Sequence, residues 1–567
     1  MNLQKYYLSF LVFLLLFVGF FHKITAMTQD LGRHFLLGDI ILKTWNVPKT
    51  NLFSYTYPDF PFINLHWLSE VVFYLIFKFI GFNGLLIFST LIVVVAFALL
   101  YFKALKKDNA IPLSIISVFY LRVLFERTDI RPEIFSFLFL SIFILVLYKF
   151  RKSFTKWIFI LPLLGLIWVN THIYFMVGVA TFGMFLIDHL IVNWHKLKTK
   201  KTFFLFIAFF LTCIATLFNP NGITGAYYPF IFNKNYGYAI EENQNIIFLW
   251  QLFRKETIIY FTASVISLFI FLSLNFRKTK PVDWFLSIFF TAVSIFAIRN
   301  FPLFVFGTFI PFANTAALSF KKLSPNLKRV FLIFVLFLFL WQIPKTYSLF
   351  EFGFGTEKGA EKAVDFFVEK DLKGPIFNNF DIGSYLGYRL YPKERVFVDG
   401  RPGEYPASFF QNTYIPMQQD LETFKKVEQR YNFNVIMFSH TDQTPWAINF
   451  LNSISKEKTW KMVYLDSFMI MFLKENEQNN LILKTLTMNN KDVQKVIDTT
   501  SSEKELTRLL LFFKKTGMLN EEILINQKLI ANNPNSCVYL SNLLTLLSVK
   551  QDPALFAYSS RFNNLCK

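Results

Sequence analysis

The chain has 567 residues, of which 54% are hydrophobic and only 17% are charged, and phenylalanine alone occurs 76 times. Several apolar runs approach the roughly 20 residues that a helix needs to cross a bilayer, which excludes an ordinary soluble protein. The net charge is +20, but the basic residues lie in short clusters between apolar runs, as in membrane proteins, so they do not indicate a nucleic-acid partner.

The first 26 residues resemble a secretory signal peptide, because Lys5 precedes an apolar run and Ala26 ends it. The apolar run at 7–21 is long for a signal peptide, however, and no clear small-x-small cleavage site follows it. We therefore interpret this segment as a retained first membrane helix. With Lys5 on the inner side of the membrane, the helix delivers Asp30 to the outer side.

The segment after this helix is the longest polar interruption in the first half of the chain, and we predict that residues 27–70 form a catalytic outer loop. It places ionisable side chains at spacings of three and four residues, which share one face of a helix: Asp30, Arg33, His34, His66 and Glu70. Ionisable groups at a membrane are functional candidates by default. The simpler alternative is a pair of interfacial helices with ordinary polar caps.

The same spacing allows a metal site as a further alternative. Asp30 and His34 form one i, i+4 pair, and His66 and Glu70 form another. Carboxylate and imidazole donors suit a divalent cation, so Mg²⁺ or Mn²⁺, held by Asp30 and His34, is the cofactor that this alternative implies. The chain contains no phosphate-binding glycine loop, dinucleotide fingerprint or Cys-x-x-Cys pair.

Beyond the first loop, apolar runs alternate with Lys- and Arg-rich loops in an order that predicts about eleven membrane spans, including the first. A surface segment at 65–79 turns at Gly81 and Gly84 before the chain enters the membrane. The spanning runs that follow lie at 85–102, 111–126, 133–148, 157–169, 173–191, 202–218, 257–275, 283–298, 301–319 and 330–345. Every basic loop then falls on one side. The sequence thus predicts a membrane domain over 1–349 in a bacterial inner membrane, with the N-terminus inside and the C-terminal region extracytoplasmic.

Further charged and polar residues lie at the predicted outer ends of these spans, among them Arg131, His172 and Arg299. An acid beside several arginines suits a reaction in which one group takes a proton while cations hold a phosphate. The alternative is that Arg131 and Arg299 extend toward lipid headgroups.

The character of the sequence changes after residue 350. Short apolar strands are predicted at 375–378, 395–398, 434–438, 460–465 and 468–473, between helical patterns, so residues 350–475 are expected to form a small α/β domain. Residues 476–567 read as a helical tail, in which Cys537 and Cys566 either pair or remain free. Asp399 and Arg401 favour a turn closed by an internal ion pair over a functional loop.

The order of these features resembles the GT-C superfamily of integral-membrane glycosyltransferases, in particular its dolichyl-phosphate-mannose-protein mannosyltransferase-like and RgtA/B/C/D-like branch. The resemblance covers roughly residues 1–345. It lies in the acid after the first helix, the long first loop with two surface helices, the Arg131-Pro132 hairpin tip, about a dozen spans and the extracytoplasmic C-terminal domain. It implies transfer of a sugar from a polyprenyl-phosphate carrier to a glycan, lipid or protein acceptor among the membrane lipids.

By position, Asp30 matches the first-loop acid of this family, which acts as a general base or a metal ligand. Many members carry two adjacent acids there, whereas this chain has Gln29 before Asp30. Asp39 and Glu70 are the nearest substitutes for the second acid.

We therefore predict an inverting glycosyltransferase for hexosyl or pentosyl transfer, with Asp30 as general base and Glu70 as a second catalytic acid. The predicted substrate-binding residues are Arg33, His34, His66, Arg131, His172 and Arg299. A membrane transporter or an envelope-assembly scaffold is the alternative from another class. A transporter should carry polar residues at mid-membrane depth, whereas the centres of these spans are nearly all Phe, Leu, Ile and Val.

Overall fold

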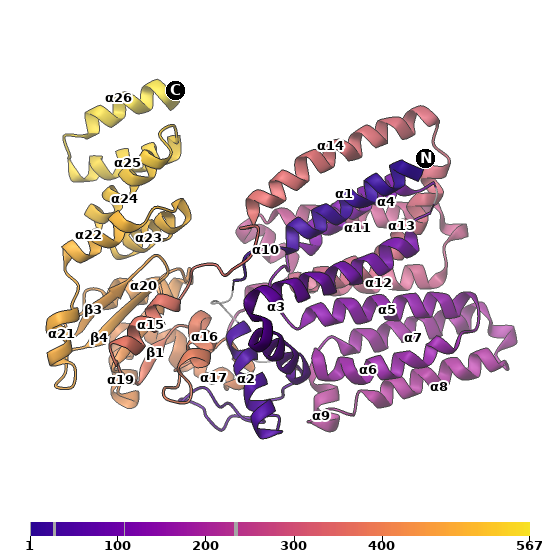
Figure 1. The fold of residues 1–567 in the computed structure, drawn as a ribbon, viewed down its shortest axis with the longest axis horizontal. Helices are drawn as coiled ribbons and strands as arrows, with labels where there is room; N and C mark the ends of the chain where they lie inside the picture. The colour runs from indigo at the N-terminus through magenta and orange to yellow at the C-terminus, as the bar shows by residue number, and fades with distance from the viewer. Residues whose placement is uncertain (1, 26–29, 107, 232–235, 567) are drawn as a thin grey trace.

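The computed structural model describes residues 2–25, 30–106, 108–231 and 236–566, which form a helical membrane part and a C-terminal part beside it. Figure 1 shows the long membrane helices side by side, and next to them a small sheet with its helices and a stack of tail helices. Helix α2 lies where the two parts meet.

A helix occupies each of the eleven predicted spans: α1 (Asn2–Phe20), α3 (Trp67–Ala104), α4 (Ala110–Leu124), α5 (Glu133–Lys152), α6 (Ile160–Thr171), α7 (Phe175–Val192), α8 (Lys200–Ala215), α11 (Glu256–Leu274), α12 (Pro281–Phe296), α13 (Phe301–Lys321) and α14 (Pro325–Leu349). Within the described residues, seven helices are both long and apolar enough to cross a bilayer. Two short helices, α9 (Gly222–Tyr227) and α10 (Ile246–Phe253), lie between α8 and α11. The chain is thus a polytopic α-helical membrane protein.

The first loop is built from two helices packed against each other. Helix α2 (Leu31–Thr44) lies along the first half of α3, which breaks at Gly81, where φ is 73°. The break confirms the turn predicted there, whereas Gly84 lies within the helix. Gly38 allows the close approach of α2, because a Cβ atom at this position would lie 2.4 Å from the backbone oxygen of Glu70.

The C-terminal domain contains a four-stranded sheet in the order β1-β2-β4-β3. Strand β1 (Ile376–Asn378) runs parallel to β2 (Val435–Ser439), whereas β4 (Met469–Lys474) is antiparallel to both β2 and β3 (Trp460–Leu465). The helices of this domain are α15 (Glu361–Glu369), α16 (Phe380–Leu390), α17 (Ala407–Phe409), α18 (Ile415–Gln419), α19 (Leu421–Tyr431) and α20 (Pro445–Ile454). All residues of β1 and β2 are buried, which explains why both strands are mainly apolar.

The predicted strand at 395–398 is wrong, because this segment pairs with the first loop instead of the sheet. The backbone N–H of Val396 donates to Phe53 at 3.0 Å, and the carbonyl of Val396 accepts from Tyr55 at 3.1 Å. Only an isolated bridge, between Ser54 and Val396, results. An apolar strand-like sequence is therefore used here to dock the α/β domain onto the first loop.

The tail is helical, as the sequence predicts. Its helices are α21 (Asn480–Leu486), α22 (Asn490–Thr499), α23 (Glu503–Thr516), α24 (Leu519–Asn532), α25 (Cys537–Lys550) and α26 (Leu555–Cys566), and α22 to α26 follow one another away from the sheet (Figure 1). A disulfide between Cys537 and Cys566 joins α25 to the end of α26.

Arg401 fastens the α/β domain to the first loop. Its guanidinium contacts Asp399 at 2.5 and 3.0 Å and Glu404 at 2.5 Å, which confirms the internal ion pair expected of this turn. The same group donates to Asn51 at 3.3 Å and lies 4.6 Å from the centre of the Phe53 ring. One buried cation thus holds two buried acids and two residues of the first loop.

We expect Arg401→Gln to destabilise the protein by about 3–5 kcal/mol, because it leaves the buried Asp399 carboxylate without its cation. Thermal unfolding of the purified protein in detergent measures the change. Arg389→Gln is the matched control, since Arg389 pairs with Asp365 while 32% of its side chain is exposed, and such pairs contribute about 1 kcal/mol or less. Equal melting temperatures for the two variants would contradict the role assigned to Arg401.

Candidate active site

A cavity of about 170 Å³ lies where the first loop, the ends of the membrane helices and the α/β domain meet. Seven of the eight predicted site residues line it: Asp30, Arg33, His34, His66, Arg131, His172 and Arg299. The charged residues that join them there are Arg127, Glu133, Glu242, Arg401 and Glu404. Residues from distant parts of the sequence therefore converge on one cavity, as the sequence hypothesis requires.

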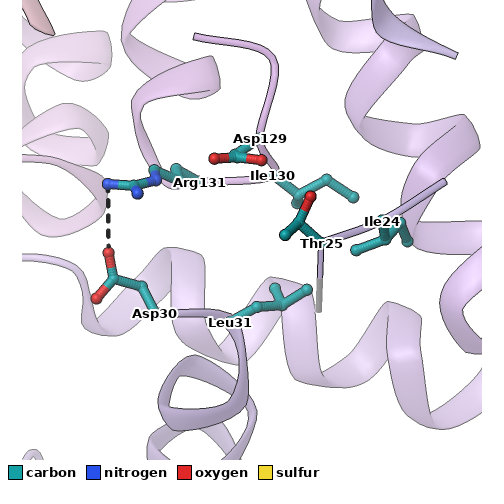
Figure 2. Close-up of a pocket in the computed structure, with 7 residues that line it drawn as sticks. All are labelled: Ile24, Thr25, Asp30, Leu31, Asp129, Ile130 and Arg131. Atoms are coloured by element: carbon teal, nitrogen blue, oxygen red, sulfur yellow. Dashed lines mark ion pairs between the residues drawn. The ribbon is translucent and has the colours of Figure 1, made fainter. Parts of the chain in front are cut away.

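Asp30, at the start of α2, is an ionised carboxylate held by two arginines. It pairs with Arg33 at 2.9 Å within the first loop and with Arg131 at 3.4 Å, and Figure 2 shows Arg131 reaching Asp30 from the facing segment that also carries Asp129. Burial alone would raise the pKa of Asp30, but the charges of Arg33 and Arg131 outweigh burial and hold the pKa well below its usual range. Its side chain is still 18% exposed, so a molecule in the cavity can reach it.

Three arginines surround the carboxylate of Glu242, which lies on a short turn at Glu241–Asn243. Arg127 makes a close contact with it, Arg131 lies at 3.1 Å and Arg299 at 3.8 Å. Burial would raise the pKa of Glu242, but the three guanidinium groups lower it to about 2. We call Arg127, Arg131 and Arg299 the arginine cluster. Arg127 and Arg131 bind the Glu242 carboxylate through charge-assisted hydrogen bonds.

Other residues fix the positions of the arginine cluster. Arg127 binds Glu133 through two parallel hydrogen bonds, at 2.8 and 3.0 Å. Arg299 donates to Asn243 at 2.9 Å and lies over the ring of Tyr174. The cluster is therefore preorganised by groups other than the anion that it holds.

The eighth predicted site residue, Glu70, lies behind the cavity wall. Its side chain is fully buried, accepts a hydrogen bond from Asn64 at 2.6 Å and accepts another from His34 Nδ1 at 3.0 Å. The sequence predicted a second catalytic acid here, whereas the geometry makes Glu70 a partner that orients His34. The burial follows from the close packing of α2 on α3.

Three histidines line the cavity in a row. The ring centres of His34 and His66 are 6.3 Å apart, and those of His66 and His172 are 5.2 Å apart. Ser136 holds Nδ1 of His172 at 2.9 Å. Burial lowers the pKa of each histidine, and nearby arginines lower it further. All three are therefore neutral near pH 7 and serve as hydrogen-bonding groups.

The described residues do not fit the predicted metal site. Among them, no group of three or more His, Cys, Asp or Glu side chains is arranged to hold a metal ion. The carboxylate of Asp30 faces two guanidinium groups, whose positive charges oppose the binding of a metal cation there. The i, i+4 spacing is real, but the carboxylate of Asp30 is already neutralised by two arginines.

Three residues that line the cavity were not predicted from the sequence: Glu242, Arg401 and Glu404. Glu242 lies in the long segment between α8 and α11, where the adjacent pair Glu241-Glu242 is the only available signal. Arg401 belongs to the turn that the sequence predicts after residues 395–398, and Glu404 carries no sequence signal of its own.

Comparison with known proteins finds solved structures that have a similar fold. No protein-family model and no curated protein matches the chain. The archaeal oligosaccharyltransferase AglB from Archaeoglobus fulgidus, solved with an inhibitory peptide and a dolichol-phosphate, is similar with a TM-score of 0.57 at 10% identity, over 92% of this chain and 85% of AglB. The chain has a fold similar to that of this oligosaccharyltransferase, as the resemblance noted in the sequence implies.

Two further solved structures are similar to this chain. The A. fulgidus oligosaccharyltransferase tethered to an acceptor peptide gives a TM-score of 0.50 at 10% identity, over 84% of this chain and 74% of the enzyme. ArnT from Cupriavidus metallidurans, in the apo state, gives 0.49 at 11% identity, over 82% of this chain and 96% of ArnT. The similarity to the two oligosaccharyltransferase structures agrees with the fold that the resemblance noted in the sequence implies.

We call the three cavity histidines, His34, His66 and His172, the histidine row. They make the stability of the protein sensitive to acid. In the unfolded chain a histidine has a pKa of about 6.5, whereas the pKa values of the folded state are lower. Below about pH 6.5 the unfolded state binds more protons than the folded state. The free energy of unfolding therefore decreases as the pH is lowered, by up to about 1.4 kcal/mol per pH unit for each histidine.

We expect the melting temperature of wild type to fall more between pH 7.5 and 5.5 than that of His66→Gln. The control is His195→Gln, which replaces an exposed histidine outside the cavity and should behave as wild type. Identical pH dependence in wild type and His66→Gln would show that His66 is not held neutral by the fold.

Proposed function

We propose that this protein is a membrane glycosyltransferase that moves a sugar from a polyprenyl-phosphate carrier to a glycan, lipid or protein acceptor on the outer face of a bacterial inner membrane. The observation that carries the proposal is the convergence of the ionised Asp30 and the arginine cluster on one cavity. Solved proteins of this fold contain a dolichol-phosphate or an acceptor peptide, which agrees with a lipid-linked donor.

The arginine cluster suits the phosphate of the donor. When the bond between the sugar and the phosphate breaks, the phosphate gains a terminal oxygen and a negative charge. Arg127, Arg131 and Arg299 present guanidinium groups that bind phosphate oxygens in pairs and remain charged at any relevant pH. The cluster would therefore bind the leaving group more strongly than the intact donor, which accelerates the reaction.

Asp30 suits the acceptor. In the proposed step the acceptor oxygen attacks the anomeric carbon, the bond from this carbon to the phosphate oxygen breaks, and its electron pair leaves with polyprenyl phosphate. The acceptor proton passes to the Asp30 carboxylate and then to water. Direct displacement inverts the configuration at the anomeric carbon. Arg33 holds the carboxylate in place at 2.9 Å.

The histidine row suits the sugar. His34, His66 and His172 are neutral, and a neutral imidazole has one donor and one acceptor. Because Glu70 takes Nδ1 of His34 and Ser136 takes Nδ1 of His172, Nε2 of these two rings would be left for the hydroxyl groups of a hexose or a pentose. Glu70 fixes the tautomer of His34 by accepting from Nδ1. A site at the ends of the spans supports an interfacial reaction over a transport pathway through the membrane.

We expect Asp30→Asn to lower kcat by a factor of about 10²–10⁴, the usual cost of losing a general base. The assay measures release of polyprenyl phosphate from a panel of polyprenyl-phosphate hexoses and pentoses, with membranes of the producing cell as the acceptor source. Asp39→Asn is the matched control, because Asp39 lies on the same helix but pairs with Lys43 and Tyr74 away from the cavity. Activity of Asp30→Asn within a few-fold of wild type would remove the assigned role.

We expect Arg299→Gln to raise KM for the lipid-linked donor roughly 10- to 100-fold, because one charge-assisted hydrogen bond to phosphate contributes about 1.5–3 kcal/mol. Arg299→Lys, which keeps the charge, should lose less. The control Arg254→Gln removes an exposed arginine that does not line the cavity. An unchanged KM in Arg299→Gln would separate Arg299 from the donor.

A further inference from the structure

The arginine cluster and the anion that it holds are mismatched. A carboxylate has two oxygens, and here both are shared among three guanidinium groups: Oε2 of Glu242 contacts Arg127 and Arg131, and Oε1 contacts Arg131 at 3.3 Å. Arg299 remains at 3.8 Å, beyond hydrogen-bonding distance. A phosphate that carries three terminal oxygens supplies one oxygen for each guanidinium group.

The turn that carries Glu242 does not depend on the Glu242 carboxylate. Glu241 pairs with Lys255 at 2.7 Å, and Asn243 accepts from Arg299 at 2.9 Å. The backbone carbonyl of Gln244 also accepts from Ile298 at 3.2 Å. The flexible Glu242 side chain, of which 22% is exposed, can therefore rotate away while its neighbours hold the turn in place.

The arginine cluster also keeps partners when Glu242 leaves. Arg127 retains both hydrogen bonds to Glu133, Arg131 retains Asp30, and Arg299 retains Asn243. Only one negative charge has to be replaced, and a phosphate replaces it. An exchange of one anion for another avoids leaving buried cations unpaired.

We propose that the Glu242 carboxylate occupies the phosphate position in the ligand-free protein and is displaced by the phosphate of the polyprenyl carrier. This inference rests on the proposed function, because it uses the same arginine cluster. Glu242 is then an internal competitor of the carrier phosphate. The affinity for polyprenyl phosphate is reduced because Glu242 occupies the cluster for most of the time, so occupancy of 90–99% weakens binding by roughly 10- to 100-fold.

The test measures binding of undecaprenyl phosphate, without a sugar, to the full-length protein in detergent. We expect Glu242→Gln to bind this lipid about tenfold or more tightly than wild type, because the neutral amide no longer competes for the arginines. Glu241→Gln is the matched control, since Glu241 is adjacent, 52% exposed and paired with Lys255 outside the cluster; its dissociation constant should stay within twofold of wild type.

A second variant covers the case in which Glu242→Gln does not fold. Glu242→Asp keeps the charge but shortens the side chain by one methylene group, so it competes less well and should also bind more tightly than wild type. Suppose that wild type binds undecaprenyl phosphate and that every Glu242 variant that folds binds it equally or more weakly. The proposed displacement of Glu242 is then refuted, whereas the phosphate site itself is not. If neither wild type nor the variants bind the lipid, the proposed function itself is refuted.

Discussion

Arg131 lies between two carboxylates, Asp30 at 3.4 Å and Glu242 at 3.1 Å, and the rest of the site depends on this shared guanidinium group. Each of these side chains is mostly buried, and a buried charge without a partner is strongly destabilising. The start of α2, the segment before α5 and the turn at Glu241–Asn243 must therefore meet at one point. One cation thus fixes the relative positions of three segments that are far apart in the sequence.

The α/β domain is part of the same arrangement, because it forms one wall of the cavity. Arg401 links it to the first loop, and the backbone of residues 53–55 pairs with Val396. From the other side, Tyr238 of the segment between α8 and α11 stacks on Phe380 with ring centres 4.4 Å apart. The segment that carries Glu242 is therefore held by both parts of the protein. A domain attached only by its linker would leave the cavity open on this side.

Most of the fold could be predicted from sequence, because apolar runs and basic loops are local signals. The turn at Gly81 could also be predicted, because a glycine between two apolar segments is a local signal as well. Asp30, Arg131 and Arg299 were predicted as a group because all lie at the predicted outer ends of membrane helices. The distances between their side chains could not be predicted from the sequence. Glu242 lies in a segment without a periodic pattern, and its role depends on the three-dimensional contacts of three arginines.

At residues 395–398 the sequence has a clear local pattern, but the prediction drawn from it is wrong. Their pattern is that of a strand, but the hydrogen-bonding partners of Val396 lie more than 300 positions earlier in the chain. Glu70 shows a third case, since its spacing from His66 suggested a reactive acid, whereas the packing of α2 on α3 buries it. Spacing identifies which side chains share a helix face, but only tertiary packing decides whether that face meets the cavity.

The low pKa of Asp30 raises the question of how so weak a base could accept a proton, and the shared guanidinium group offers an answer. During the proposed transfer the phosphate gains negative charge as the sugar departs. Because Arg131 would contact both the phosphate and Asp30, this new charge draws on the same cation and raises the pKa of the carboxylate nearby. Asp30 would then become more basic as the acceptor hydroxyl loses its proton. The contact that keeps Asp30 ionised at rest would thus couple bond breaking at the phosphate to proton transfer at the acceptor.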